Sequence, residues 1–217
     1  MSTHAALPRQ SMEVDLVCVG FGPAMGGFLT TLCKGMVSSD GSPRFESRAM
    51  PGMPLQVLCY ERADDIAFGV SGAVTRARSI RASFPDLDAS QIPMAAPVRA
   101  EKLVYLLDPV GASRRPRWLR AADRLARSFP ALSGCKTDAI EIPFTPDFLH
   151  KKDGLVISIG QFMQWVGQQV MATGLVQIWP ATPVAEPLIE NNRVVGVRLA
   201  DQGVDRSGNP DAGYLPG

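Results

Sequence analysis

The sequence predicts an α/β fold built on a strand–helix–strand unit, and three observations support that class. Residues 14–19, VDLVCV, form an almost continuous apolar run typical of a strand in a parallel sheet covered on both faces. A glycine turn follows at once, and residues 23–35 then place apolar side chains at helical spacing. A second apolar run, LQVLCYE at residues 55–61, completes the unit.

The composition is that of an ordinary globular protein. The chain has 217 residues, of which 46% are hydrophobic and 20% charged. The formal net charge of +1 gives no reason to expect a nucleic-acid partner. Residues 1–13 lack the pattern of a secretory signal, and no apolar run approaches the length that spans a bilayer. We therefore expect any membrane contact to be peripheral.

The cysteines are predicted to be structural. None is in a Cys-x-x-Cys pair, and Cys18 and Cys59 lie in apolar strand-like runs, where a free cysteine behaves as a small buried hydrophobe. Only two histidines could join them in a metal site. We expect no metal ligands, and the sequence shows neither an acid–base dyad nor an activated nucleophile, so no catalytic residue is assigned.

The turn after the first strand matches the first two glycines of the pattern G-x-G-x-x-G. Gly20 permits the tight turn, and Gly22 lets the backbone approach a pyrophosphate at the helix N-terminus. Pro23 fits the first helical turn, where a missing N–H costs nothing. Met25 replaces the third glycine, which serves helix packing, and Gly26 beside it can relieve the crowding. The alternative interpretation is an ordinary tight turn.

Glu61 ends the second strand and favours the dinucleotide interpretation. A carboxylate there can accept hydrogen bonds from both hydroxyls of an adenosine ribose and would repel the 2′-phosphate of NADP. Glu61 lies roughly twice as far from Gly20 as the usual separation of about 20 residues. Residues 34–54, rich in Gly, Pro, Ser and Met, predict an insertion loop that accounts for the excess.

The rest of the chain continues to alternate strands and helices. We expect a short basic helix within residues 68–90, strands at 98–107, 154–160 and 176–181, a helix at 161–174, and a hairpin at 183–200. Residues 204–217 are predicted to form a polar Gly/Pro loop with no closing helix or strand. Because a dinucleotide domain normally has more parallel strands, we expect the chain to be incomplete at its C-terminus.

Several stretches resemble the N-terminal, FAD-binding part of the electron-transfer flavoprotein–ubiquinone oxidoreductase family. They are VCVGFGPAMGG, YERADDIAFGVSGAV, APVRAEKLVYLL, GLVISIGQFMQWVGQQVMATGLVQIWP and DQGVDRSGNPDAGYLPG, the last being quite specific to the family and its close relatives. The likeness covers most of residues 14–110 and 150–217. It implies a Rossmann-like FAD-binding domain of the glutathione-reductase/hydroxylase type with an inserted β-rich segment.

The resemblance implies non-covalent FAD, with its pyrophosphate on the glycine turn, its ribose on Glu61, its ribityl chain or flavin ring near residues 71–73 and its adenine near Val184. The departures are Met25 and the residues Phe68 and Val70 around Gly69. The implied cofactor-binding residues are Gly20, Phe21, Gly22, Pro23, Ala24, Met25, Gly26, Glu61, Arg62, Ser71, Gly72, Ala73 and Val184.

The reaction implied by the resemblance passes electrons from reduced electron-transfer flavoprotein to a quinone at the membrane, here the cytoplasmic face of a bacterial inner membrane. The family's cysteine-ligated iron–sulfur cluster lies in its C-terminal part, so we expect a missing C-terminal part or a companion chain to complete the reaction. Two alternatives remain, a related flavin-dependent reductase of the geranylgeranyl-reductase-like group and a non-catalytic FAD-fold subunit that binds a partner flavoprotein.

Residues 113–130 carry six arginines against one acid and are predicted to form an amphipathic helix. One interpretation is a surface helix whose apolar stripe packs onto its own protein, and the other is contact with an anionic membrane or a partner. The position of the segment in the resembled family favours membrane contact, and the absence of a stacking platform disfavours nucleic acid. The apolar residues that share a face are Trp118, Ala122, Leu125 and Phe129.

These expectations divide the chain into four segments. The middle of the chain, which includes the amphipathic helix, is predicted to interrupt the FAD-binding domain on its substrate or quinone side. The segments are a tail at 1–13, the first part of the FAD-binding domain at 14–90, the inserted membrane-contact segment at 91–150, and the second part of the domain at 151–217.

Overall fold

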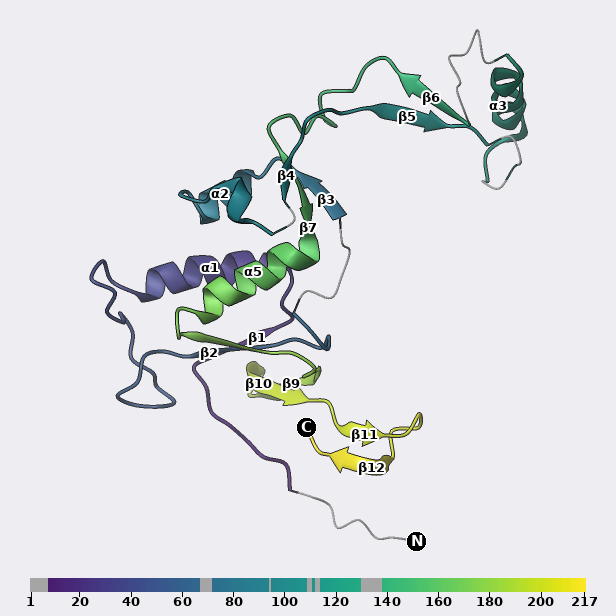
Figure 1. Ribbon diagram of the computed structural model, residues 1–217. Coiled ribbons are helices and arrows are strands. Elements are labelled where there is room, and N and C mark those ends of the chain that lie inside the picture. The colour runs from purple at the N-terminus through teal and green to yellow at the C-terminus, as the bar shows by residue number, and fades with distance from the viewer. Residues whose placement is uncertain (1–7, 67–71, 94, 109–110, 112–113, 130–137) are drawn as a thin grey trace. The chain divides into compact units, whose positions relative to one another are not determined.

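A computed structural model describes residues 8–66, 72–93, 95–108, 111, 114–129 and 138–217 (Figure 1). The chain divides into two compact units. The first unit comprises the residues up to Ala73 together with Arg78–Ala95 and Ile157–Gly217, and the second comprises Val74–Ala77 and Ala96–Val156.

The first unit is built on a parallel sheet of three strands. β1 (Leu16–Val19), β2 (Val57–Tyr60) and β8 (Val176–Trp179) lie in the order β1-β2-β8 and in register. Helix α1 (Pro23–Met36) connects the first two strands, and α5 (Ile159–Met171) precedes the third. The predicted strand–helix–strand unit is confirmed, and the architecture is a Rossmann-like α/β fold.

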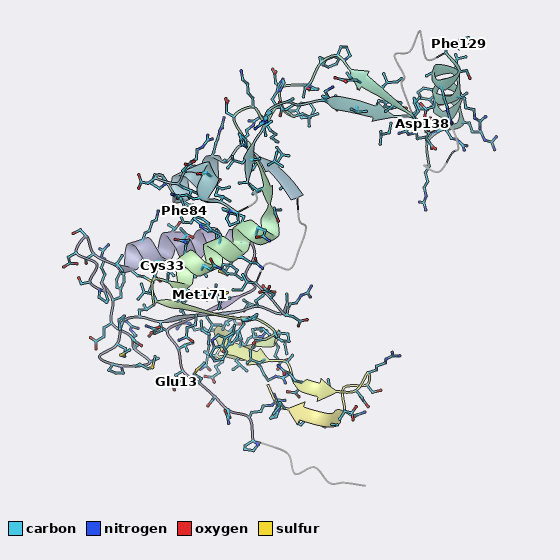
Figure 2. The ribbon with its side chains drawn as sticks, in the orientation of Figure 1. Glu13, Cys33, Phe84, Phe129, Asp138 and Met171 are labelled. Atoms are coloured by element: carbon cyan, nitrogen blue, oxygen red, sulfur yellow. The ribbon has the colours of Figure 1, made fainter. Side chains whose placement is uncertain are left out.

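Both helices cover the same face of this sheet and form the core with it (Figure 1). Leu29 of α1 and Cys59 of β2 are fully buried, and Met163 of α5 is 2% exposed. Cys33 and Met171, labelled in Figure 2, belong to the same helical layer. Burial of a side chain such as Leu29 stabilises the fold by about 2 kcal/mol. The apolar spacing of α1 and α5 therefore predicts most of their buried faces, although Phe28, an apolar residue at this spacing in α1, is 49% exposed.

Gly26 sets the distance between α1 and α5. A Cβ atom at this position would lie 2.6 Å from Cε of Met163 and 3.2 Å from Cγ1 of Val166. A side chain here would therefore displace the end of the flexible Met163 side chain and crowd Val166. Met25 beside it is partly buried against the core, so the packing role expected of a third glycine is carried one residue later.

The segment between α1 and β2 is largely irregular, as predicted, with isolated bridges joining Val37 to Pro43 and Glu46 to Pro54. Asp15, just before β1, holds the segment in place. Its carboxylate accepts hydrogen bonds from the backbone N–H groups of Arg48, Ala49 and Gln56. The Ser47 hydroxyl and these amides lower the pKa of Asp15 to about 2.

After β8 the chain forms the predicted hairpin of β9 (Val184–Glu190) and β10 (Arg193–Leu199), which are antiparallel. Asn191 and Asn192 occupy its turn with φ of 49° and 61°. A two-residue hairpin turn favours positive φ at both positions, which asparagine tolerates better than most residues. This explains why Glu190-Asn191-Asn192 marks the turn.

The predicted loop at residues 204–217 is wrong, because β11 (Gln202–Val204) and β12 (Pro210–Leu215) pair antiparallel there. Gly203, with φ of 64°, allows a close backbone approach, since a Cβ there would lie 2.4 Å from the carbonyl oxygen of Gly213. Most side chains of the two strands are exposed. The strands therefore lack the apolar alternation by which a sequence reveals them.

Asp201 closes this second hairpin at its base. Its carboxylate accepts hydrogen bonds from the backbone N–H of Gly217, the hydroxyl of Tyr214 and the guanidinium of Arg9. Arg9 also donates to the carbonyl of Gly217. The pKa of Asp201 falls to about 2, first because of Arg9 and then because of the Gly217 amide.

The remaining elements are short. The basic helix expected within residues 68–90 is α2 (Arg78–Ser83) of the first unit, followed by a 3₁₀ turn at Ala89–Gln91. In the second unit, β5 (Leu103–Leu106) pairs antiparallel with β6 (Ala139–Ile142), and α3 (Arg117–Ser128) lies between them in the chain. A further sheet has the order β3-β7-β4, from Gly72–Thr75, Leu155–Ser158 and Ala96–Pro97.

Candidate dinucleotide-binding site

The turn from β1 into α1 needs glycine at its first position. Gly20 has φ of 82°, in the left-handed region that strains other residues. Its N–H donates a 2.7 Å hydrogen bond to the carbonyl of Tyr60 at the end of β2. This bond joins the ends of the two strands and directs the chain across the edge of the sheet into the helix.

Gly22 is the N-cap of α1 and leaves that end of the helix open. Its backbone is extended, and a Cβ atom there would meet no heavy atom within 4 Å. No side chain caps the helix, Pro23 occupies its first turn, and that turn contains no acidic residue. The positive end of the helix dipole therefore faces a space that a phosphate group can enter.

Glu61 is joined directly to this turn, although 40 residues separate it from Phe21. One carboxylate oxygen accepts a 2.5 Å hydrogen bond from the backbone N–H of Phe21, and the other accepts one of 2.9 Å from Ala63. Glu61 follows β2 directly, and its side chain is only partly buried. The structure therefore places a carboxylate beside the glycine turn, as expected from parallel strands that end at the same edge.

Phe21 contributes to the site through its backbone, because its side chain belongs to the core. The residue is 2% exposed. Its ring lies against Gly167 of α5, where a Cβ atom would be 3.4 Å from Cε1 of Phe21 and also 3.4 Å from Cγ2 of Ile66. The buried ring holds the turn to the helical layer, while the amide points to Glu61. The sequence contains no signal for this direction of the ring.

A second connection to Glu61, through Thr182, was not anticipated from the sequence. The carbonyl of Glu61 accepts a 2.8 Å hydrogen bond from the N–H of Thr182, and Ala181 donates one of 2.7 Å to the carbonyl of Ala63. Val184, at the start of β9, follows two residues later and is partly buried. The chain that leads to Val184 is therefore attached to the backbone around Glu61.

The other predicted cofactor-binding residues are distributed as follows. Ala24 and Arg62 are exposed beside the turn and the acid. Gly72 begins β3 and is exposed, whereas Ala73 is partly buried. Ser71 lies outside the described residues, as do Phe68, Gly69 and Val70. The structure thus brings together the glycine turn, Glu61 and the segment before Val184.

The described cysteines are buried, as predicted for structural residues. Cys18 and Cys59 occupy facing positions on β1 and β2, and Cys33 lies in α1. Burial raises the pKa of the Cys59 thiol to about 12, so this group stays protonated at neutral pH. Cys135 lies outside the described residues.

The apolar stripe of α3 is exposed within the second unit. Trp118, Leu125 and Phe129 are 72%, 63% and 56% exposed. The predicted helix is confirmed, and its stripe does not pack onto the second unit, to which the helix belongs. No helix among the described residues is long and apolar enough to cross a membrane.

Comparison with known proteins supports the resemblance. No protein-family model matches the chain. The electron transfer flavoprotein-ubiquinone oxidoreductase of Pseudomonas aeruginosa is 29% identical over 210 residues, covering 96% of this chain and 31% of that protein. A probable enzyme of the same name from Acinetobacter baylyi is 25% identical, covering 97% and 31%, and the mitochondrial one of Sus scrofa is 25% identical, covering 97% and 28%.

Two solved structures are similar at lower identity. A geranylgeranyl bacteriochlorophyll reductase-like protein from Thermoplasma acidophilum has a TM-score of 0.47 and 15% identity, covering 88% of this chain and 36% of that one. A probable FAD-dependent monooxygenase from Pseudomonas aeruginosa has a TM-score of 0.46 and 11% identity, covering 90% and 39%. Over nearly its whole length, this chain is similar to proteins named electron transfer flavoprotein-ubiquinone oxidoreductase, and it spans about 30% of their length.

Proposed function

We propose that the chain is the FAD-binding part of a flavoprotein oxidoreductase that passes electrons from reduced electron-transfer flavoprotein to a membrane quinone. The observation that carries the proposal is the glycine turn joined to Glu61 at the open N-terminus of α1. The same arrangement suits the two polar parts of a dinucleotide, its pyrophosphate and its ribose. The similarity to proteins named for this reaction supports the finer assignment.

The residues present fit FAD. In this proposal the pyrophosphate occupies the space beside Gly22, where the absence of a side chain and the helix dipole both favour it. Each carboxylate oxygen of Glu61 accepts one hydrogen bond from the backbone and retains capacity for a ribose hydroxyl. Val184 would lie near the adenine, and residues 71–73 would lie near the flavin end.

FAD, when bound, supplies the redox chemistry, and the protein supplies binding, orientation and electrostatics. Glu61 holds the ribose in one place because its own position is fixed by Phe21 and Ala63. The buried ring of Phe21 keeps the turn rigid. The transfer of electrons through such a site requires no acid–base dyad.

The complete reaction requires groups beyond this site. We propose that electron-transfer flavoprotein is the electron donor and that any iron–sulfur cluster is held outside this chain. Cluster ligands are thiolates, whereas Cys18, Cys33 and Cys59 are buried and occupy three different elements. The cluster and the quinone site would then belong to a C-terminal part or companion chain.

We further propose that the protein acts at a membrane surface, peripherally, and that residues 113–130 make the contact. The exposed side chains of Trp118, Leu125 and Phe129 suit the headgroup region, and the arginines around them suit anionic lipids. In a bacterium, this surface would be the cytoplasmic face of the inner membrane.

The test is an electron-transfer experiment on the protein purified from its native source together with any companion chains. Reduced electron-transfer flavoprotein is added anaerobically, followed by a soluble ubiquinone analogue, while the flavin absorbance is recorded. Because the donor's own flavin is oxidised as the bound FAD is reduced, we expect little net change in absorbance in the first step and a rise in the second, when electrons pass to the quinone. Bound FAD that the donor does not reduce would favour a reductase of the geranylgeranyl-reductase-like group. A flavin-free protein would favour a non-catalytic subunit.

A further inference from the structure

Helix α3 is held to its unit by polar contacts. Among its residues only Asp123 is buried, at 2% exposure. Soluble helices usually bury an apolar stripe and expose their charges. In α3 this relation is reversed, so a specific set of polar bonds must select which side of the helix faces its own unit.

Asp123 is the centre of those bonds. Its two oxygens accept hydrogen bonds from the hydroxyl of Tyr105 at 2.9 Å, the backbone N–H of Asp108 at 3.0 Å and the guanidinium of Arg115 at 2.8 Å. Arg115 also lies over the ring of Tyr105, 5.0 Å from its centroid. Burial alone would raise the pKa of Asp123, but the three donors hold it below the usual range.

A second bond on the same side of α3 is the ion pair between Arg127 and Asp138, at 3.2 Å. At 3.6 residues per turn, Asp123 and Arg127 lie roughly 130–170° around the helix from the centre of the apolar stripe. Contact through these two residues therefore directs the stripe outward. Figure 2 labels Phe129, at one end of the stripe, and Asp138, which directly precedes β6.

We propose that Asp123, Tyr105 and Arg115 form an anchor that fixes the rotation of α3 about its axis, so that its stripe faces an anionic lipid surface. The inference rests on the membrane contact proposed above and assigns it a positioning device. The lipid is argued from charge, because Arg117 and Arg124 are exposed and lie roughly 110–130° around the helix from the centre of the stripe, on the other side from Asp123, where long arginine side chains can reach an anionic surface. The only acid of the helix is the buried Asp123.

The test measures sedimentation of the full, FAD-loaded protein with phosphatidylglycerol vesicles and with phosphatidylcholine vesicles. We expect the wild type to bind the anionic vesicles, and Trp118→Ser to release it. Asp123→Asn removes the charge that three donors share and should weaken binding about tenfold. Tyr105→Phe removes one donor and should weaken it about threefold. The same Asp-to-Asn change at the exposed Asp86 is the control and should leave binding unchanged.

Each outcome decides a separate point. Equal binding of Asp123→Asn and the wild type, with Trp118→Ser released, would leave the membrane contact standing and refute the anchor. A wild type that binds neither vesicle would refute the lipid surface itself, while bound FAD would leave the cofactor proposal intact. If light scattering showed a wild-type dimer that Trp118→Ser dissociates, the stripe would contact a second copy of the chain and not lipid. If circular dichroism shows that Asp123→Asn loses helix content, the vesicle binding of Tyr105→Phe tests the anchor instead.

Discussion

Helices α1 and α3 are both amphipathic, but they are held in place by opposite faces. α1 buries Leu29 and Cys33 against the sheet and against α5. α3 buries only Asp123 and exposes Trp118 and Leu125. The buried side of α1 belongs to the core, so what α1 offers to a ligand is its N-terminal end. The buried side of α3 is polar, and the side that α3 leaves exposed for a partner is the apolar stripe.

This difference predicts where substitutions act. Changes along the buried side of α1 should lower stability, because apolar burial and close packing hold it. Changes at its N-terminal end should affect ligand binding and leave stability almost unchanged, because the structure leaves free space there. The following substitutions test this separation of the end of α1 from its side.

The largest effect is expected at the end of the helix. Gly22→Val should abolish FAD binding, because its side chain fills the space proposed for the pyrophosphate, while the thermal midpoint stays near that of the wild type, because a Cβ there meets nothing within 4 Å. Met25→Gly should bind FAD as tightly as the wild type or more tightly. Flavin fluorescence titration and thermal unfolding measure the two quantities.

The control for this pair is Gly35→Val, the same change near the other end of α1, where a Cβ also meets nothing within 4 Å. It should retain FAD. Equal loss of FAD in Gly22→Val and Met25→Gly would refute the division between phosphate contact and helix packing at this turn.

The side of α1 is tested by Gly26→Val. The new side chain would overlap Cε of Met163, 2.6 Å from the added Cβ, and crowd Cγ1 of Val166 at 3.2 Å, so side chains of α5 would have to shift. Overpacking of this kind costs about 1–3 kcal/mol of unfolding free energy, measured by urea denaturation. The adjacent Gly27→Val, where a Cβ meets nothing within 4 Å, is the matched control. Similar losses in both variants would mean that helix packing is not what requires Gly26.

Glu61→Gln should have a smaller effect, because the amide nitrogen cannot accept the hydrogen bond that Phe21 or Ala63 donates to the carboxylate. The amide keeps one acceptor oxygen but loses the charge, so FAD affinity should fall about tenfold. Equilibrium dialysis against FAD measures the change, with the exposed Glu190→Gln as control. An unchanged affinity would show that Glu61 holds the turn through Phe21 without contributing to the ribose.

The smallest effect concerns Asp201, far from either helix in the sequence. Its pKa of about 2 in the folded state lies below the value of about 3.9 expected when unfolded. The carboxylate therefore stabilises the fold above about pH 4, and this contribution is lost as the pH falls toward 2. The thermal midpoint of Asp201→Asn should fall less steeply than that of the wild type below pH 4. Asp211→Asn should follow the wild type, and parallel curves for all three proteins would contradict the assignment.

Much of the fold could be predicted because its core strands are apolar runs. The runs at β1, β2 and β8, the spacing in α5 and the asparagine turn all produce local patterns. Glu61 could be placed beside the glycine turn because parallel strands end at one edge. β11 and β12 could not be predicted, since exposed strands rich in glycine and proline carry no alternation.

The site was less predictable where a side chain's direction decides its role. The sequence predicts that Phe21 belongs to the cofactor turn, but its ring packs against α5. Nothing in the local pattern indicates this direction of the ring. Asp123 has a recognisable signal in the sequence. A lone acid among six arginines, opposite the apolar stripe, is a natural partner for one of them, and the structure pairs it with Arg115.

The most direct test of the account is the identity of the cofactor in the native protein. The protein is purified without added flavin, denatured, and the released small molecules are identified by chromatography and mass spectrometry. The account predicts FAD, in an amount close to one molecule per chain. A colourless preparation that releases no flavin, or one that releases a nicotinamide dinucleotide instead, would contradict it.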